Sequence, residues 1–131
     1  MFFIWFSNNC LKINAQFVST LFKESRYSLA YKRFKLCNVY NNIKKHEPDY
    51  IIVNAGGALV PNFESTPIIM DEYQVMSVVQ ETKEGKVIAI HLDAIDHCAT
   101  TREVLKAMAT KNNISNDKLL IPNDGETIEL N

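Results

Sequence analysis

Three short runs in the second part of the chain are apolar at almost every position, and they restrict the fold more than any other feature. These runs are residues 49–57 (DYIIVNAGG), 86–91 (KVIAIH) and 118–122 (KLLIP). Successive side chains of a strand point to opposite faces, so a run without polar positions leaves no face for solvent. At 131 residues the chain has the length of one domain. We therefore predict an α/β fold with a helix-covered sheet.

Helices are predicted between these strands. The segment 38–48 reads as a short helix that Pro48 stops, because proline cannot continue a helix. Asp71 followed by Gln74 is a variant of the capping box, which satisfies amide groups at a helix start. We expect the helix that begins there to run to about Thr82.

A further helix is expected after the second strand. Thr100 with Glu103 forms another capping-box pattern. Val104, Leu105 and Met108 would supply the face of this helix that packs inward. Helices and strands then alternate along the chain, as in other layered α/β proteins.

The charge of the chain is divided unevenly. Residues 1–37 hold six basic and one acidic side chain, whereas residues 38–131 hold eight basic and fourteen acidic ones. Such a split is typical of a basic arm for nucleic acid or anionic lipid, or of a stretch with a different sequence history. The aromatic residues are scattered and no basic run exceeds two residues. We expect neither a nucleic-acid nor a membrane partner, and treat residues 1–36 as an atypical basic segment before a domain over 37–131.

Cysteine usage and the N-terminus bear on the compartment. The three cysteines have no repeating spacing, which favours a reducing environment over a disulfide framework. The apolar start of the chain has no basic residues before it and is too short for export or for spanning a bilayer. A cytoplasmic location is the expectation.

Candidate functional residues follow two of the predicted strands. In open α/β sheets, ligands collect outside the carboxyl ends of the strands. This rule indicates Asn54, Gly56 and Gly57 after one strand, and residues 91–97 (HLDAIDH) after the next.

Four blocks of the sequence carry a family resemblance. They are PDYIIVNAGGA, PIIMDEYQVMSVVQ, KVIAIHLDAIDHCATTREVL and LLIPNDGETIEL, within residues 37–131. In this order they resemble the C-terminal half of metallo-β-lactamase-fold hydrolases, in the branch of the ascorbate-phosphate lactonases. The resemblance implies one helix-covered sheet half of an αββα sandwich. It also implies a Zn²⁺ or Mn²⁺ cofactor and a small-molecule ester, lactone or phosphoester substrate, hydrolysed by metal-bound hydroxide.

The resemblance gives one residue a definite role. His91 occupies the place of the family's last metal-binding histidine, at the end of a strand. The family's other ligands, an H-x-H-x-D-H motif and a bridging aspartate, do not occur in the sequence. Zinc sites need three or more protein ligands, so we expect this chain not to retain the metal.

The neighbours of His91 are open to two interpretations. Asp93, Asp96 and His97, with Asn54, Gly56 and Gly57, would line the site. Alternatively, the acidic residues belong to a turn before the next helix, and the two glycines serve a turn that needs a positive φ.

Two functional classes remain. The first is an enzyme by descent, truncated or frame-disrupted near residue 37 and inactive as this chain. Losing the other sheet would expose an apolar sheet face, so self-association is expected. The second is a non-catalytic remnant or protein-interaction module. An unrelated Rossmann-like ligand binder would explain the alternation of elements, but no G-x-G-x-x-G is present.

Overall fold

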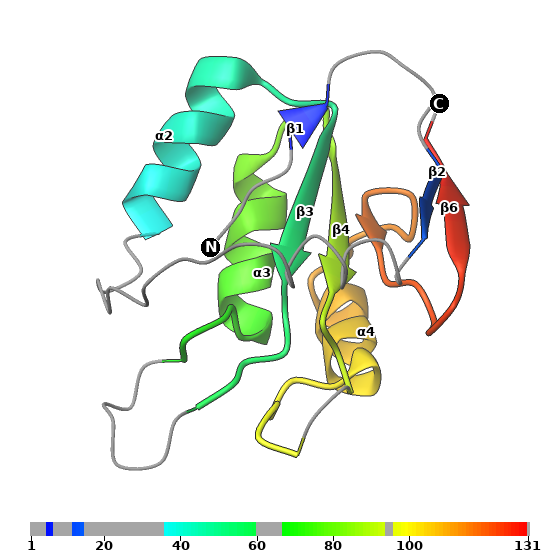
Figure 1. Cartoon of the computed structure of the whole chain (residues 1–131). Helices are drawn as coiled ribbons and strands as arrows, with labels where there is room; N and C mark the ends of the chain where they lie inside the picture. The colour runs from blue at the N-terminus through cyan, green and yellow to red at the C-terminus, as the bar shows by residue number, and fades with distance from the viewer. Residues whose placement is uncertain (1–4, 7–11, 15–35, 60–66, 94–95, 131) are drawn as a thin grey trace, which may run out of the picture.

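A four-stranded sheet organises the molecule. The computed structural model describes residues 5–6, 12–14, 36–59, 67–93 and 96–130. The sheet consists, in spatial order, of β1 (Trp5–Phe6), β3 (Tyr50–Asn54), β4 (Lys86–Ile90) and β5 (Leu119–Leu120). β3, β4 and β5 are parallel, whereas β1 pairs with β3 in the antiparallel direction (Figure 1). The three predicted apolar runs are therefore the three parallel strands, and the α/β prediction is confirmed.

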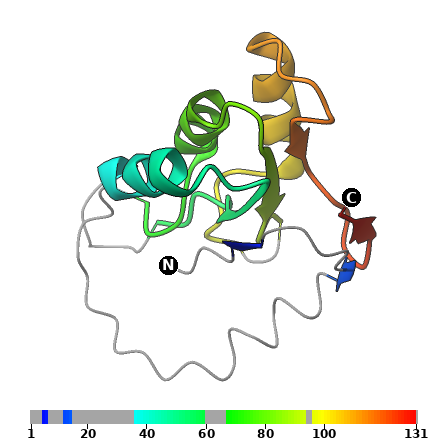
Figure 2. The same ribbon diagram turned by 90° about the horizontal axis from the view of Figure 1, so that it is seen from above.

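Three helices follow one another beside the sheet. They are α2 (Leu36–His46), α3 (Glu72–Glu81) and α4 (Arg102–Lys111). α3 lies between the other two and contacts both, and Figure 2 shows α2 and α3 side by side on one side of the strands. Each parallel strand is thus reached from the preceding one through a helix, as βαβ connections require.

The principal core lies between the helices and the sheet. Ile51 and Val53 of β3 and Val87 and Ala89 of β4 alternate toward it, and all four are buried. The helices contribute buried residues to the same cluster: Val39, Ile43, Val75, Met76, Val78, Val79, Leu105 and Ala109. Alternation along the strands therefore gives the sheet one face that belongs to the helices.

The opposite face of the sheet is apolar as well. Ile52 and Ile88 form a second buried cluster with Leu130, and Ile90 packs against it. Ile52 is 6% exposed and Ile88 4%, so these two positions do not form the exposed sheet face that was expected. Self-association through that face stays a prediction.

The start of α3 agrees with its sequence signal. The Asp71 carboxylate accepts a hydrogen bond from the amide of Gln74 at 2.8 Å, and the Gln74 side chain accepts one from the amide of Asp71 at 3.2 Å. These two bonds complete the capping box. The helix ends at Thr82, whose hydroxyl donates to the Val78 carbonyl.

The start of α4 differs from the prediction by one residue. Thr101, not Thr100, is the N-cap, and its hydroxyl oxygen accepts from the amide of Val104. Thr100 is fully buried and donates instead to the Glu72 carboxylate at 2.6 Å. Val104 is 39% exposed rather than inward, whereas Leu105 is buried as expected.

The N-terminal segment contributes two short strands. β1 extends the main sheet, and β2 (Lys12–Asn14) pairs with β6 (Thr127–Glu129) in a separate antiparallel sheet. The boundary near residue 37 stays a prediction. Within the described ranges, no helix is both long and apolar enough to cross a membrane.

Candidate functional site

The candidate residues gather at the carboxyl ends of β3 and β4. The parallel register places Asn54 opposite Ile90, and the amide of Ala55 donates to the Ile90 carbonyl at 2.9 Å. The segments that leave the two strands therefore start side by side, as the general rule for ligand sites in such sheets requires. In Figure 1 both arrows point to this end, where the loop that leads to α3 also begins.

The two glycines permit a close approach of three chain segments. A Cβ atom on Gly56 would lie 2.4 Å from the His91 carbonyl oxygen and 2.8 Å from Cys98 Sγ. Gly57 has a φ of +59°, and a Cβ there would lie 2.5 Å from Thr100 Oγ1. No larger residue fits either position without movement of backbone or of a buried side chain. The glycines therefore bring the β3 end against the His91 and Thr100 segments.

Asn54 carries a buried acceptor without a partner. Its main-chain carbonyl accepts from the amide of Met70 at 3.0 Å. Its side-chain Oδ1 is buried and has no hydrogen-bond partner among the described residues. An orphaned buried acceptor costs free energy, so such atoms are retained in few places, among them functional sites. The atom lies at the end of the strand that precedes the two glycines.

The segment after β4 has a rare backbone conformation. His91 has a φ of +63° and Asp93 a φ of +55°, in the left-handed region that non-glycine residues seldom occupy. Between them, Leu92 is 2% exposed and anchors the segment in the core. The side chain of His91 is exposed. Residues in such conformations cluster at functional sites, where the surrounding structure holds them.

Asp93 is engaged by α4. Its Oδ2 accepts from Arg102 Nη1 at 2.8 Å and from the amide of Arg102 at 3.2 Å. The turn interpretation of Asp93 is therefore the one that the contacts support, since its carboxylate binds the amide at the start of α4 as short acidic side chains often do.

Asp96 and His97 lie at the periphery. Both side chains are exposed. The His97 carbonyl accepts from the amide of Leu59 at 3.4 Å, and an isolated β-bridge joins Ala58 and Cys98. The structure thus brings the backbone of this segment beside the glycine turn, and among the described residues neither of these side chains forms a hydrogen bond or ion pair with His91.

Three residues of this region were not predicted from the sequence to belong to the site. Thr100 and Glu72 form a partly buried hydrogen bond between the starts of α3 and α4. Arg102 connects α4 with the His91 segment. Thr100 and Arg102 flank the true N-cap, so the doubled threonine before an arginine was the one local signal for them.

The described residues do not form a metal centre by themselves. No group of three or more His, Cys, Asp or Glu side chains with the geometry of a metal site occurs among them. His91 is exposed at a strand end and suits a ligand role, but a zinc site requires at least three protein ligands. The part of the chain that the structure describes therefore does not fit a complete metal site.

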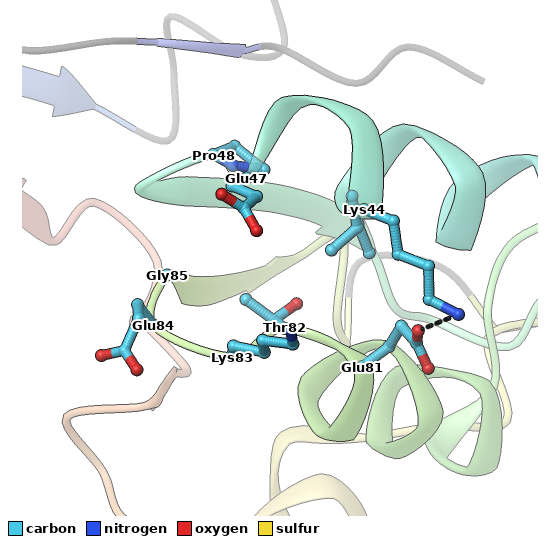
Figure 3. A pocket seen from close by; sticks show the side chains of 9 residues that line it. Lys44, Glu47, Pro48, Glu81, Thr82, Lys83, Glu84 and Gly85 are labelled. Atoms are coloured by element: carbon cyan, nitrogen blue, oxygen red, sulfur yellow. Dashed lines mark ion pairs between the residues drawn. The ribbon is translucent and has the colours of Figure 1, made fainter.

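A hollow lies at the opposite end of the strands. A pocket of about 370 Å³ is formed where α2 leads into β3 and α3 leads into β4 (Figure 3). Lys44 and Glu81 form an ion pair at its rim, with 2.7 Å between Nζ and Oε1. Glu47 and Pro48 lie across the pocket from Thr82 and Lys83.

Lys118, which directly precedes β5, binds main-chain carbonyls near this pocket. Its Nζ donates to the carbonyls of Lys83 and Gly85, both at 2.7 Å. Partial burial lowers the pKa of Lys118 below its usual value, against the charge of Glu84, which raises it. These contacts tie the turn before β4 to the start of β5, and none of them involves the carboxyl-end residues.

Comparison with solved structures shows which proteins the chain is similar to. The chain is 35% identical to a possible metal-dependent hydrolase from Veillonella parvula, with a TM-score of 0.65 over 72% of this chain and 35% of that one. It is 28% identical to the isothiocyanate hydrolase from Delia radicum gut bacteria, with a TM-score of 0.63 over 70% of this chain and 34% of the neighbour.

A similar share of the chain matches a curated relative. The UPF0173 protein YddR of Bacillus subtilis is 28% identical over 89 residues, which are 68% of this chain and 34% of the relative. No protein-family profile matches the chain. The chain spans about a third of the length of these relatives.

These findings confirm the resemblance stated from the sequence. The chain is similar to part of a metal-dependent hydrolase, with a partial metallo-β-lactamase-like fold built from a parallel sheet and three helices. The name of the Veillonella parvula neighbour describes that protein as metal-dependent.

Proposed function

We propose that this chain forms one wall of the active site of a metal-dependent hydrolase and that His91 is its metal ligand. The observation that carries the proposal is the 35% identity to a possible metal-dependent hydrolase over 72% of the chain. His91 supports it by its exposure and its φ of +63° at the end of β4.

The other ligands would come from protein outside the described residues. The absence of a three-ligand group in the described part of the chain agrees with this division. Zn²⁺ is the first metal to test and Mn²⁺ the second, because imidazole suits zinc and several other first-row metals. The role of the described residues is then to hold His91 in place and to shape the wall beside it.

A small molecule with a hydrolysable bond is the proposed substrate. Esters, lactones and phosphoesters are candidates, and the name of one neighbour adds isothiocyanates. Gly56 and Gly57 contribute backbone without side chains beside His91, which leaves room for a ligand to approach the main chain.

A second candidate is a non-catalytic interaction module. The observation in its favour is that the described residues hold no complete metal site. In this case His91 has no metal to bind, and the exposed side chains of the carboxyl end would serve a protein partner.

A hybrid enzyme separates the two candidates. Residues 37–131 of this chain replace the matching third of the Veillonella parvula hydrolase, which supplies the remaining two thirds. Thermal unfolding first establishes that the hybrid folds. Hydrolysis is then measured with a panel of one isothiocyanate, one lactone, one carboxylic ester and one phosphodiester, with Zn²⁺ and with Mn²⁺.

Two histidine variants provide the matched comparison. We expect the hybrid to hydrolyse at least one member of the panel, His91→Ala to abolish this, and His46→Ala on α2 to leave it unchanged. A folded hybrid without activity, or one whose activity survives His91→Ala, would contradict the proposal and favour the interaction module.

A further inference from the structure

Arg102, the first residue of α4, makes contacts that no other described side chain matches. Its Nε donates to the Pro122 carbonyl at 2.9 Å, and its Nη1 donates to the Leu92 carbonyl at 3.3 Å. Nη1 also binds Asp93 Oδ2 at 2.8 Å, and Nη2 binds the carboxylate of Asp124. One guanidinium thus joins the segment after β4, the start of α4 and the segment after β5.

Arg102 binds the segment 91–93, whose backbone conformation is unfavourable. His91 and Asp93 both have positive φ values, which cost free energy in residues with a Cβ atom. Such a conformation persists only when surrounding contacts fix it. Arg102 binds the next two residues after His91, one through its carbonyl and one through its carboxylate.

The geometry favours a specific role for arginine. The side chain of Arg102 is only 17% exposed, and that of Asp93 is 34% exposed, so the bond between them is partly shielded from water. The planar guanidinium directs several N–H groups outward in a fixed fork. A lysine carries a single ammonium group and cannot reach the same three segments with this geometry.

We propose that Arg102 is a positioning residue that locks the His91 segment in its left-handed conformation and so fixes the direction of the His91 side chain. Asp93 is the receiving group on the segment, because it binds both the guanidinium and the amide of Arg102. Asp124 is 86% exposed and lends the weaker support. The consequence for hydrolysis rests on the proposed function; the lock itself does not.

The test reads the backbone of His91 directly. In the isotopically labelled full chain, a positive φ gives a strong nuclear Overhauser effect between the amide and α protons of the same residue. Spectra are recorded for the original protein, Arg102→Gln, Arg102→Lys and the control Lys106→Gln. Lys106 is an exposed basic residue on the same helix, so its replacement removes the same charge without touching the His91 segment.

We expect the strong signal at His91 and Asp93 in the original protein and in Lys106→Gln. Both Arg102 variants should lose it, and exchange of the residue-102 amide should quicken on the order of tenfold, as the loss of one charge-assisted hydrogen bond implies. Arg102→Lys keeps the positive charge but not the fork of N–H groups. Loss of the signal in this variant would show that the fork is required and that the charge alone is not enough. Retention of the signal in both Arg102 variants would overturn the proposal.

A second variant covers the case in which the Arg102 variants do not fold. Asp93→Asn removes the charge of the receiving group, while asparagine itself tolerates a positive φ. Loss of the His91 signal in Asp93→Asn supports the lock, and an unchanged signal overturns it. Neither measurement uses metal or substrate, so failure of the lock leaves the proposed function standing, and failure of the hybrid enzyme leaves the lock standing.

Discussion

The amino and carboxyl ends of β3 and β4 differ in structure. At the amino end, the chain turns from α2 and α3 into the strands and leaves a pocket of about 370 Å³ with charged residues on its rim. At the carboxyl end, Gly56, Gly57 and the orphaned acceptor of Asn54 lie on one strand end, and His91 and Asp93 with their positive φ values lie on the next. The amino end has the hollow and a single residue with positive φ, Glu47 at +42°, whereas the carboxyl end combines two such residues with the orphaned acceptor.

This difference shows why a hollow alone does not identify a site. The pocket at the amino end has side chains that pair with each other or with backbone, as Lys44 does with Glu81. The carboxyl end combines the positive φ values of His91 and Asp93 with the orphaned acceptor of Asn54, two features that cluster at functional sites. A third of a larger enzyme can present a wall rather than a cavity, because the rest of the enzyme closes it. On these grounds we propose the carboxyl end as the functional end.

The largest effect is expected when Gly56 or Gly85 is replaced by alanine, because the added Cβ atom would collide with a main-chain carbonyl oxygen. A Cβ on Gly56 would lie 2.4 Å from the His91 carbonyl, and one on Gly85 would lie 2.1 Å from that of Pro48. Backbone must move in both variants, so each should lower the free energy of unfolding by about 3 kcal/mol. Urea unfolding followed by circular dichroism measures this.

The two glycine variants should differ in their effect on the backbone conformation of His91. Gly56→Ala pushes on the His91 carbonyl and should weaken the positive-φ signal there, whereas Gly85→Ala acts at the other end and should leave it unchanged. Gly125→Ala is the control, because its Cβ meets no atom within 4 Å and only its φ of +78° opposes the change. A cost of about 1 kcal/mol is expected for it. Equal effects of Gly56→Ala and Gly85→Ala on His91 would contradict the separation of the two ends.

An intermediate effect is expected at the buried threonine. Thr100→Val removes the hydroxyl that binds the Glu72 carboxylate at 2.6 Å, in a position with no exposure. Loss of a hydrogen bond to a charged group should lower the free energy of unfolding by about 1.5 kcal/mol. The matched control is Thr110→Val, whose exposed hydroxyl donates to the Lys106 carbonyl within α4. If both changes cost the same, the bond between Thr100 and Glu72 contributes nothing particular to this end.

The smallest effect is expected at the rim of the pocket. The Lys44 side chain is 66% exposed and that of Glu81 29% exposed. Ion pairs of this kind contribute little in water, so Lys44→Gln should lower the free energy of unfolding by about 0.3 kcal/mol and less in high salt. A loss above 1 kcal/mol, insensitive to salt, would show that the amino end is a more rigid structure than its exposure indicates.

Local signals in the sequence predicted the elements of the fold well. The apolar runs gave the parallel strands because burial on both faces leaves a direct trace in composition. The capping box of Asp71 and Gln74 was also readable, because both partners lie within one helical turn. Asn54, Gly56, Gly57 and His91 were singled out because they follow predicted strands, and the register of β3 and β4 brings the ends of these strands side by side. Their role in a site stays a prediction.

Contacts between distant residues were beyond the sequence. Thr100 fits the capping pattern better than Thr101 because Glu103 follows it by three residues, yet its hydroxyl binds Glu72, 28 positions away. Arg102 likewise meets Asp124 across 22 positions. No short-range pattern encodes such partners, so the helix start was misplaced by one residue and the role of Arg102 went unnoticed.

The measurement that most directly tests the assignment of His91 is the metal content of the hybrid enzyme. The hybrid, its His91→Ala variant and its Gly85→Ala variant are purified in buffer that contains Zn²⁺ and are then dialysed. The bound zinc per chain is measured by inductively coupled plasma mass spectrometry. We predict that the hybrid and the Gly85→Ala variant retain metal at the level of the parent hydrolase, whereas His91→Ala loses it. Full metal content in His91→Ala, with loss in Gly85→Ala, would move the site to the other end of the strands and contradict the account.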